Sequence, residues 1–289
     1  MANLKDIKRR IKSVKNTQQI TKAMKMVSAA KLKRAQDEIT AARPYAEKML
    51  SLITSLASKT SPESHPLLSV REEVNRIGVV LITSDRGLCG GFNTQMLRTA
   101  DRFLREKSGV EAQLYLVGRR GTDHFKKRSS TIMHSRNVGS VRPNYADAVK
   151  IAQDVITAYL GGELDEVYII YSEFKSALTQ TPVVQKVLPV PPPVGAGEEE
   201  EVSVEFKFEP SMEAVLAALL PKYVEVQSFR ALLETSASEH GARMSSMDSA
   251  SKNASSMIGS LTLQYNRIRQ AAITKELMEI IGGAEALKG

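Results

Sequence analysis

The sequence has only one cysteine, Cys89, among its 289 residues. A single thiol cannot form a disulfide within the chain, so a disulfide scaffold and an internal dithiol switch are both excluded. Long hydrophobic runs are also missing: stretches such as Val79–Ile82 and Ala214–Leu220 are far shorter than the ~18 residues of a membrane-spanning helix. We therefore expect a chain that does not cross a bilayer.

Motifs of catalysis and metal binding are missing as well. The chain contains neither a G-x-x-x-x-G-K-[ST] phosphate loop nor a G-x-S-x-G elbow. Its histidines have no metal-ligand spacing with Cys89 or with carboxylate clusters; they are His65, His124, His134 and His240. The sequence therefore predicts a protein that is not an enzyme in its own right and that holds no cofactor or metal.

One glycine-rich stretch, Asp85–Asn93, lies between an expected strand and an expected helix, where phosphate-binding loops occur. Its spacing is not G-x-G-x-x-G, so we interpret it as a tight structural turn. Cys89 lies between its glycines, with no evident base beside it in the sequence. We expect a small buried side chain there and not a reactive thiol.

Acidic residues are scarce at the start of the chain. Residues 1–34 contain eleven lysines and arginines and a single acid, Asp6, whereas the other 255 residues contain 29 bases and 31 acids. The net charge is thus +10 on one segment and −2 on all the rest. A charge so concentrated indicates an acidic partner surface for this segment.

The basic segment also belongs to an apolar heptad stripe. Counting a and d positions from Leu4 to Leu56 gives sixteen residues, of which twelve are apolar, so one long coiled-coil helix is predicted. A cleaved transit peptide and a DNA-reading basic region are the alternatives, and neither explains a stripe that runs through the basic residues and far beyond them. Pro44 should kink the helix or leave a carbonyl unsatisfied.

The stripe weakens between Gln18 and Ser28. Within this stretch the apolar residues move to another face of the helix, at Ile20, Ala23, Met24, Val27 and Ala30. One interpretation is a stutter that relaxes the supercoil. The other is that this face meets a different partner.

A second stripe with 3,4 spacing extends from Tyr223 to Ala272. Ser211 is a candidate N-cap, and Pro221 predicts a bend or a new helix start. Nine serines between Ser236 and Ser260 are also typical of a flexible linker, which stays open as an alternative. We expect the two terminal helices to wrap around each other in an antiparallel coiled coil, because neither is stable alone in water.

Between the helices the pattern changes to strand and helix alternation, which implies a mainly parallel sheet. The expected strands are Ile77–Ser84, Gln113–Val117, Glu166–Tyr171 and Thr181–Val190, and the expected helices are Thr94–Lys107 and Tyr145–Leu160. A Pro/Gly/Glu stretch at 191–201 predicts an exposed turn. The predicted fold is α/β: a long antiparallel coiled coil of N- and C-terminal helices with an inserted Rossmann-like α/β domain, divided as 1–58, 74–208 and 211–289.

Three segments of the chain resemble the gamma subunits of F-type ATP synthases. They are Ile20–Val27 (ITKAMKMV), Ser84–Gly91 (SDRGLCGG) and Ile273–Ala284 (ITKELMEIIGGA). The resemblance covers essentially the whole chain, in order and with similar spacing. It is to the bacterial type, and no cysteine pair matches the thiol switch of the chloroplast type, so that regulation is not expected.

The resemblance implies a rotor subunit, which forms the central stalk and couples ion flow to ATP synthesis or hydrolysis. The implied partners are the alpha and beta subunits, the epsilon subunit and the ring of c subunits, with no nucleic acid, at the cytoplasmic face of the bacterial plasma membrane. It assigns beta-subunit contacts to Met24, Lys25, Arg269, Gln270 and Thr274. It assigns a foot near the c-ring or epsilon to Phe206, Lys207, Phe208 and Glu209.

Two other classes of function are compatible with parts of the sequence. A basic coiled-coil protein that binds nucleic acid would show an affinity that falls steeply with salt. A nucleotide-binding α/β enzyme would bind ATP as an isolated chain, and the missing phosphate loop disfavours it.

Overall fold

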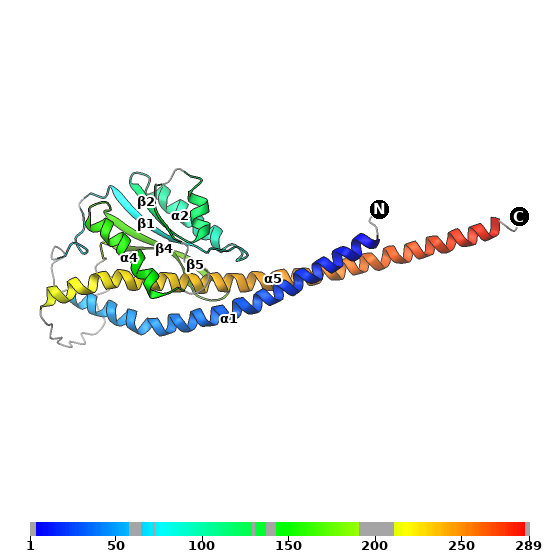
Figure 1. Cartoon of the computed structure of the whole chain (residues 1–289), viewed down its shortest axis with the longest axis horizontal. Coiled ribbons are helices and arrows are strands. Elements are labelled where there is room, and N and C mark those ends of the chain that lie inside the picture. The colour runs from blue at the N-terminus through cyan, green and yellow to red at the C-terminus, as the bar shows by residue number, and fades with distance from the viewer. Residues whose placement is uncertain are drawn as a thin grey trace. The chain divides into compact units, whose positions relative to one another are not determined.

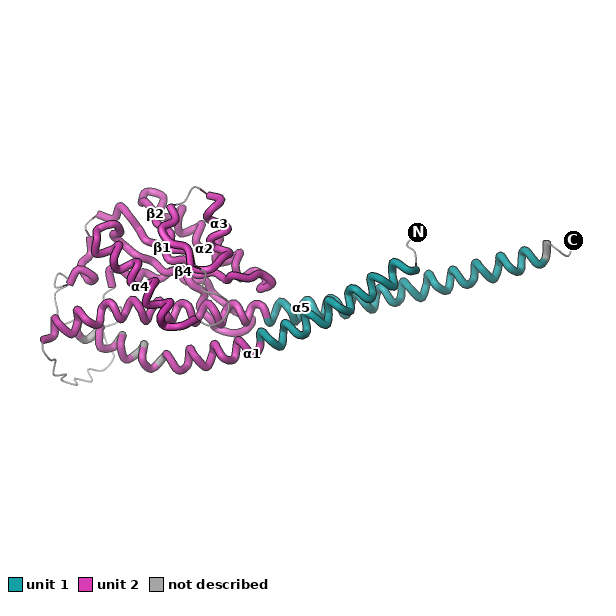
Figure 2. Tube along the Cα trace, in the orientation of Figure 1, with its two compact units in different colours: residues 1–28, 244–289 teal, residues 29–243 magenta. Residues whose placement is uncertain are grey.

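The computed structural model describes residues 4–57, 65–71, 73–128, 131–136, 143–190 and 211–286. The chain forms two compact units, residues 29–243 and residues 1–28 together with 244–289 (Figure 2). The boundaries of these units cut through both long helices. The predicted division into 1–58, 74–208 and 211–289 therefore remains a proposal about folding units.

The terminal helices are α1 (Leu4–Ala57) and α5 (Met212–Ala286). Pro44 and Pro221 both lie inside these helices, so α5 does not restart at Pro221 as one interpretation had it. Residues 236–260 are helical, so the alternative interpretation of this segment as a flexible serine-rich linker is wrong. The predicted cap is present, because the Ala214 amide donates to Ser211 Oγ at 3.2 Å.

In the unit of residues 1–28 and 244–289, the two helices pair along the predicted stripes (Figure 2). Ile7 of α1 and Met247 and Ala254 of α5 are buried. The α1 stripe does not stutter, because Thr21 and Ser28 are only 8% and 3% exposed at the expected seam positions. Small polar side chains thus continue the seam, and the apolar residues beside them are left on the outside.

The larger unit, residues 29–243, contains a five-stranded sheet in the order β3-β2-β1-β4-β5. All pairs are parallel except β4 with β5, which confirms the expected mainly parallel sheet. The strands are β1 (Arg76–Ile82), β2 (Glu111–Val117), β3 (Thr131–Arg136), β4 (Glu166–Phe174) and β5 (Gln180–Leu188). The shorter helices are α2 (Phe92–Glu106), α3 (Arg119–Phe125) and α4 (Tyr145–Leu160).

Two of these elements, β3 and α3, were not expected from the sequence. Strand β3 is the edge strand of the sheet and is mostly exposed, so it lacks the buried apolar run by which the other strands are recognised. Helix α3 has only seven residues, too few for a helical period to be read.

The sheet separates two hydrophobic cores. Ile77, Val79 and Leu81 of β1 pack with α2 and α3 on one face. On the other face Val80 and Ile82 pack with α4, with the last turns of α1 and with the first turns of α5 (Figure 1). The long helices therefore supply part of the core of the α/β domain, and this places α5 against the sheet.

Candidate interaction surfaces and the carboxyl edge of the sheet

The topology of the sheet places a switch point at the carboxyl ends of β1 and β4. The strand order reverses there, since β2 and β3 lie on one side of β1 and β4 lies on the other. Ligands of open α/β sheets bind outside the strand ends at this switch point. If the domain bound a nucleotide as Rossmann-like enzymes do, this is where it would lie.

Helix α5 covers this edge of the sheet. The amide of Ser172 in β4 donates to Thr235 Oγ1 at 3.3 Å, and Ser238 Oγ donates to the Ser172 carbonyl at 3.1 Å. The amide of Phe174 donates to Glu234 Oε2 at 2.8 Å. The side chains of α5 thus take up the hydrogen bonds that the end of β4 would offer a ligand.

The glycine-rich stretch after β1 forms the predicted tight turn. Leu88 and Gly90 both have left-handed backbone, with φ of 62° and 57°. Cys89 is 2% exposed, and Asn93 Nδ2 donates to its Sγ at 3.2 Å. Burial raises the pKa of the Cys89 thiol, so this side chain is a neutral buried group, as expected.

We predict that the isolated chain neither binds ATP tightly nor hydrolyses it, because α5 occupies the carboxyl end of β4 at the switch point and the turn lacks the phosphate-loop spacing. Isothermal titration with ATP and Mg²⁺ tests this, with an ATP-binding protein that has a phosphate loop as the positive control. Stoichiometric binding that is lost on substitution within Gly87–Gly91 would contradict it.

A buried charged cluster anchors α5 to the turn. Arg243 Nη2 donates to Glu239 Oε1 at 2.6 Å and to the Gly87 carbonyl at 3.3 Å, and both side chains of the ion pair are 10% exposed. Burial raises the pKa of Glu239 more than the Arg243 charge lowers it. Burial, together with the charges of Arg243 and Lys31, lowers the pKa of His240 to about 4, so its imidazole is neutral at pH 7.

Replacing Arg243 by methionine should destabilise the chain by about 3–5 kcal/mol, because Glu239 is then left buried without a partner. The pKa of Glu239 is already raised in the folded chain, and it should rise further in the variant. When folding raises the pKa of a carboxyl group, its contribution to the free energy of unfolding is fully present below the unfolded pKa. That contribution is lost as the pH rises through the folded pKa. The deficit of Arg243→Met should therefore grow from about pH 5 to about pH 8.

Urea unfolding at both pH values measures this deficit, and the double variant Glu239→Gln, Arg243→Met is the control. It should recover most of the lost stability and remove the pH dependence. A deficit that is equal at both pH values would show that the lost packing of Arg243 matters more than its charge.

The first predicted partner residues, Met24 and Lys25, lie beside the helix seam in the smaller unit. Met24 is half-buried, whereas Lys25 occupies a seam position and its Nζ donates to Asp248 Oδ1 of α5 at 2.6 Å. Asp248 also pairs with Lys252 at 2.8 Å, and the two ammonium groups lower the pKa of Asp248 to about 2. Lys25 thus already has a carboxylate partner within the chain, and its role toward another subunit remains a proposal.

The outer face of α1 beside this pair is apolar as well as basic. Ile20, Met26 and Val27 are 59%, 61% and 57% exposed. Ile20 and Val27, seven residues apart, share one side of the helix, whereas Met26 and the exposed Lys22 lie on another. Apolar residues between Gln18 and Ser28 therefore stay exposed in the described part of the chain, which is the arrangement expected of a contact surface.

Three further predicted residues lie near the end of α5. Arg269, Gln270 and Thr274 are all exposed, roughly 30 Å along the helix from Asp248 at its 1.5 Å rise per residue. The two groups of partner residues therefore do not form one site. Phe206, Lys207, Phe208 and Glu209 lie outside the described residues, as does the 191–201 stretch.

The end of α5 also exposes large apolar side chains that the list of candidate residues left out. They are Ile273, Leu277, Met278, Ile280 and Ile281, each between 49% and 68% exposed. An apolar helix end that its own chain does not cover indicates burial against another molecule. The sequence does contain a signal for this surface, because the segment Ile273–Ala284 is rich in apolar residues although it lies beyond the last seam residue, Ala272.

Among the residues that the structure describes, no helix combines the length and the apolar character that a membrane span needs. Nor do the described histidine, cysteine and carboxylate side chains gather in threes as a metal site requires.

The chain was compared with known proteins. The ATP synthase family model matches residues 3–287. The ATP synthase gamma chain of Geobacter sp. (strain M21) is 53% identical over 100% of both chains, and that of Moorella thermoacetica is 49% identical over 100% of both.

Two solved structures are similar to the fold. The central stalk and c-ring structure of the Tetrahymena thermophila mitochondrial ATP synthase contains a chain that is 30% identical, with a TM-score of 0.57 over 80% of this chain and 99% of that one. A chain of the Euglena gracilis mitochondrial ATP synthase has a TM-score of 0.71 over 98% of this chain and 94% of that one. At 21% identity it supports the fold alone.

Proposed function

The chain belongs to the family of ATP synthase gamma chains, and on this premise we propose that it is the rotor of the central stalk. It is a non-catalytic subunit, since ATP is made and hydrolysed by the beta subunits. It transmits torque between the membrane c-ring and the ring of alpha and beta subunits. The partners implied are alpha, beta, epsilon and the c-ring.

One observation carries this proposal: the paired helices of residues 1–28 and 244–289 leave apolar surface uncovered at two places. These are the exposed residues Ile20, Met26 and Val27 of α1 and the end of α5 beyond Ala272. Exposed apolar surface of this kind is typical of a helix pair that is buried against other proteins. A ring of surrounding subunits supplies such a surface.

The mechanism follows from asymmetry. Two unlike helices cannot present the same surface to three beta subunits at once, so each beta subunit meets a different face of the shaft. Each contact favours a different beta conformation, and rotation shifts the populations in sequence. Because coupling is reciprocal in free energy, nucleotide binding and release also turn the shaft.

Particular residues are proposed to make these contacts. Arg269, Gln270 and Thr274 would meet a loop of a beta subunit near the end of the shaft, while Met24 and Lys25 would face an acidic region of beta. The net charge of +10 on residues 1–34 supports an acidic partner. Phe206, Lys207, Phe208 and Glu209 would belong to the foot near the c-ring or epsilon.

The proposed location is the cytoplasmic face of the bacterial plasma membrane, peripheral to it and held there by the rest of the complex. Gamma chains of bacteria at about half identity support this. The nucleic-acid-binding alternative is set aside, since it explains only the basic segment and not the family match along residues 3–287.

Rotation of the assembled complex tests the proposal. The chain, with a reporter cysteine introduced at exposed Gly109 and carrying a bead, should rotate in one direction when ATP is added to its complex with alpha and beta subunits. Cys89 is buried and should stay unlabelled. Failure of the chain to assemble with alpha and beta, or hydrolysis with a stationary bead, would contradict a rotor.

A further inference from the structure

A cavity of about 650 Å³ lies between α1 and α5 in the larger unit, and no residue proposed above uses it. Its walls come from α1, from α5 and from Pro143, which lies just before α4. Small side chains at Ala35, Ala41 and Ser236 leave the space open. Farther along the same helices, larger side chains such as Met49 and Leu220 are buried in the hydrophobic core.

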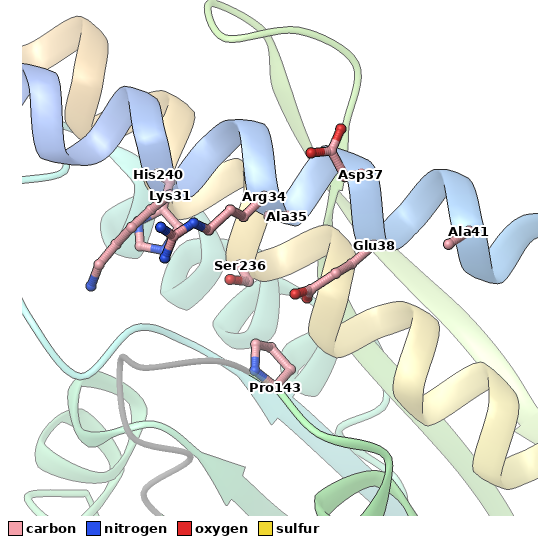
Figure 3. A pocket seen from close by; sticks show the side chains of 9 residues that line it. All are labelled: Lys31, Arg34, Ala35, Asp37, Glu38, Ala41, Pro143, Ser236 and His240. Carbon is pink, nitrogen blue, oxygen red and sulfur yellow. The ribbon is translucent and has the colours of Figure 1, made fainter.

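The charges of the cavity are divided between its ends. In Figure 3, Lys31, Arg34 and His240 lie together at one end, and Glu38 approaches Ser236 and Pro143 at the other. A second acid, Asp37, also lines the cavity, and its carboxylate points away from Ser236 and Pro143. Lys31 and Glu38 have other interactions within the chain. Arg34 is exposed on α1, and among the described residues nothing engages its guanidinium, so this side chain is available to a ligand.

His240 adds a buried polar group to the cationic end. Its side chain belongs to a residue only 6% exposed, and its Nδ1 faces Arg243 Nη1 at 3.4 Å. Since guanidinium only donates, Nδ1 of the neutral ring is the acceptor and Nε2 carries the proton. The charges that lower the pKa of His240 are both positive, those of Arg243 and Lys31. The field at the imidazole therefore favours a negative ligand.

We propose that this cavity binds a small tetrahedral oxyanion, such as inorganic phosphate, at the end formed by Lys31, Arg34 and His240. A compact oxyanion has enough acceptor oxygens for a forked guanidinium and an imidazole N–H at once. The carboxylate of Glu38 lies at the opposite end and leaves the cationic end to the anion (Figure 3). The site is independent of the beta-subunit contacts proposed above.

NMR of the full chain labelled at its histidine rings tests this. His240 is one of four histidines, and its signals are assigned by their loss in His240→Gln. Addition of inorganic phosphate, with chloride used to match ionic strength, should shift the His240 signals saturably and leave those of His65 and His134 in place. Equal shifts of all the histidines, or no shift at His240, would overturn the proposal.

Two variants that each remove one positive charge test whether phosphate binds in the cavity or to the basic helix in general. Arg34→Gln should weaken phosphate binding at least about tenfold, because a charge-assisted hydrogen bond is lost. Lys33→Gln removes the same charge from an exposed neighbour that does not line the cavity, and it should change binding by less than about twofold. If both variants weaken binding equally, the anion is attracted by the basic helix in general and the cavity is not its site.

The pH dependence gives an independent readout, with sulfate as the probe because its charge is constant in this range. A bound anion should raise the pKa of His240 from about 4. By reciprocity, sulfate should bind more tightly as the pH falls from about 6 to about 4, and most of this gain should be lost in His240→Gln, which keeps Asp37 and Glu38. A gain in affinity that is equal in the wild type and in His240→Gln would place the anion away from the imidazole and refute the assignment.

Discussion

Replacing Gly118 by alanine should prevent the α/β domain from folding. Gly118 follows β2 with a φ of 97° and a ψ of 143°, a backbone conformation open essentially to glycine alone. A Cβ at this position would overlap the Thr83 carbonyl oxygen and lie 2.7 Å from its carbon, and backbone at the end of β1 cannot move aside. With strain and overlap combined, the loss should exceed about 4–5 kcal/mol.

Two other glycines in the same unit serve as controls that separate the backbone strain from the steric overlap as causes of the lost stability. Gly162 also has a positive φ, of 75°, but open space around its Cβ position, so Gly162→Ala should cost about 1–2 kcal/mol from strain alone. Gly109 has open space and no positive φ, and Gly109→Ala should be nearly neutral. Urea unfolding and soluble yield measure all three. A Gly118→Ala chain as stable as Gly162→Ala would mean that the end of β1 relaxes.

Replacing Met24 by lysine should uncouple the complex more than it unfolds the chain. Met24 is half-buried at the margin of the seam, so a lysine there reaches solvent without burying its charge. If this position faces an acidic region of beta, as proposed above, the lysine adds an ion pair that holds one rotational state too long. We expect ATP hydrolysis to persist while ion pumping and ATP synthesis fall to a small fraction of the wild-type rates.

The seam provides the structural control. Ile7 is 3% exposed, so Ile7→Lys buries an unpaired charge and should cost several kcal/mol and block assembly. Ile11 also lies at a heptad position, but it is half-buried, so Ile11→Lys should cost less than Ile7→Lys. Assembly yield, hydrolysis, pumping and synthesis are measured for each variant. Loss of assembly in Met24→Lys as severe as in Ile7→Lys, or unchanged coupling, would show that Met24 does not face a partner.

A second control tests whether the new lysine interacts with Asp248, the partner of Lys25 within the chain. Because Asp248 binds Lys25 at 2.6 Å and Lys252 at 2.8 Å, a lysine at position 24 could also be drawn to Asp248. In the double variant Met24→Lys, Asp248→Asn this competition is removed. If coupling returns, the defect of Met24→Lys arises within the helix pair. If it does not return, the added charge acts on the partner.

The long helices were predictable because their signal is periodic and repeats over many turns. The 3,4 spacing from Leu4 and from Tyr223 identified buried residues as far apart as Ile7 and Ala254. The strands β1, β2 and β4 were predicted for a similar reason, since strands buried on both faces carry continuous apolar runs. Where the signal is short or polar, as in α3 and β3, the sequence did not reveal the element.

The candidate contact residues could also be predicted from the sequence only in part. Arg269, Gln270 and Thr274 were named through resemblance to a family, and the structure places them at the surface of α5. The internal partner of Lys25 could not have been named, because Asp248 is 223 residues away in the chain. Nothing in a single sequence relates two charges at that separation.

Patterns of neighbouring residues were enough to predict the two coiled-coil stripes, the mainly parallel sheet between them, the basic first segment and the lack of a phosphate loop. Three features became visible only in the folded chain: Thr21 and Ser28 continue the seam, α5 binds the carboxyl end of β4, and Arg34 and His240 line one cavity. These depend on contacts between distant segments. Their free energies come from burial and pairing, which local sequence patterns do not record.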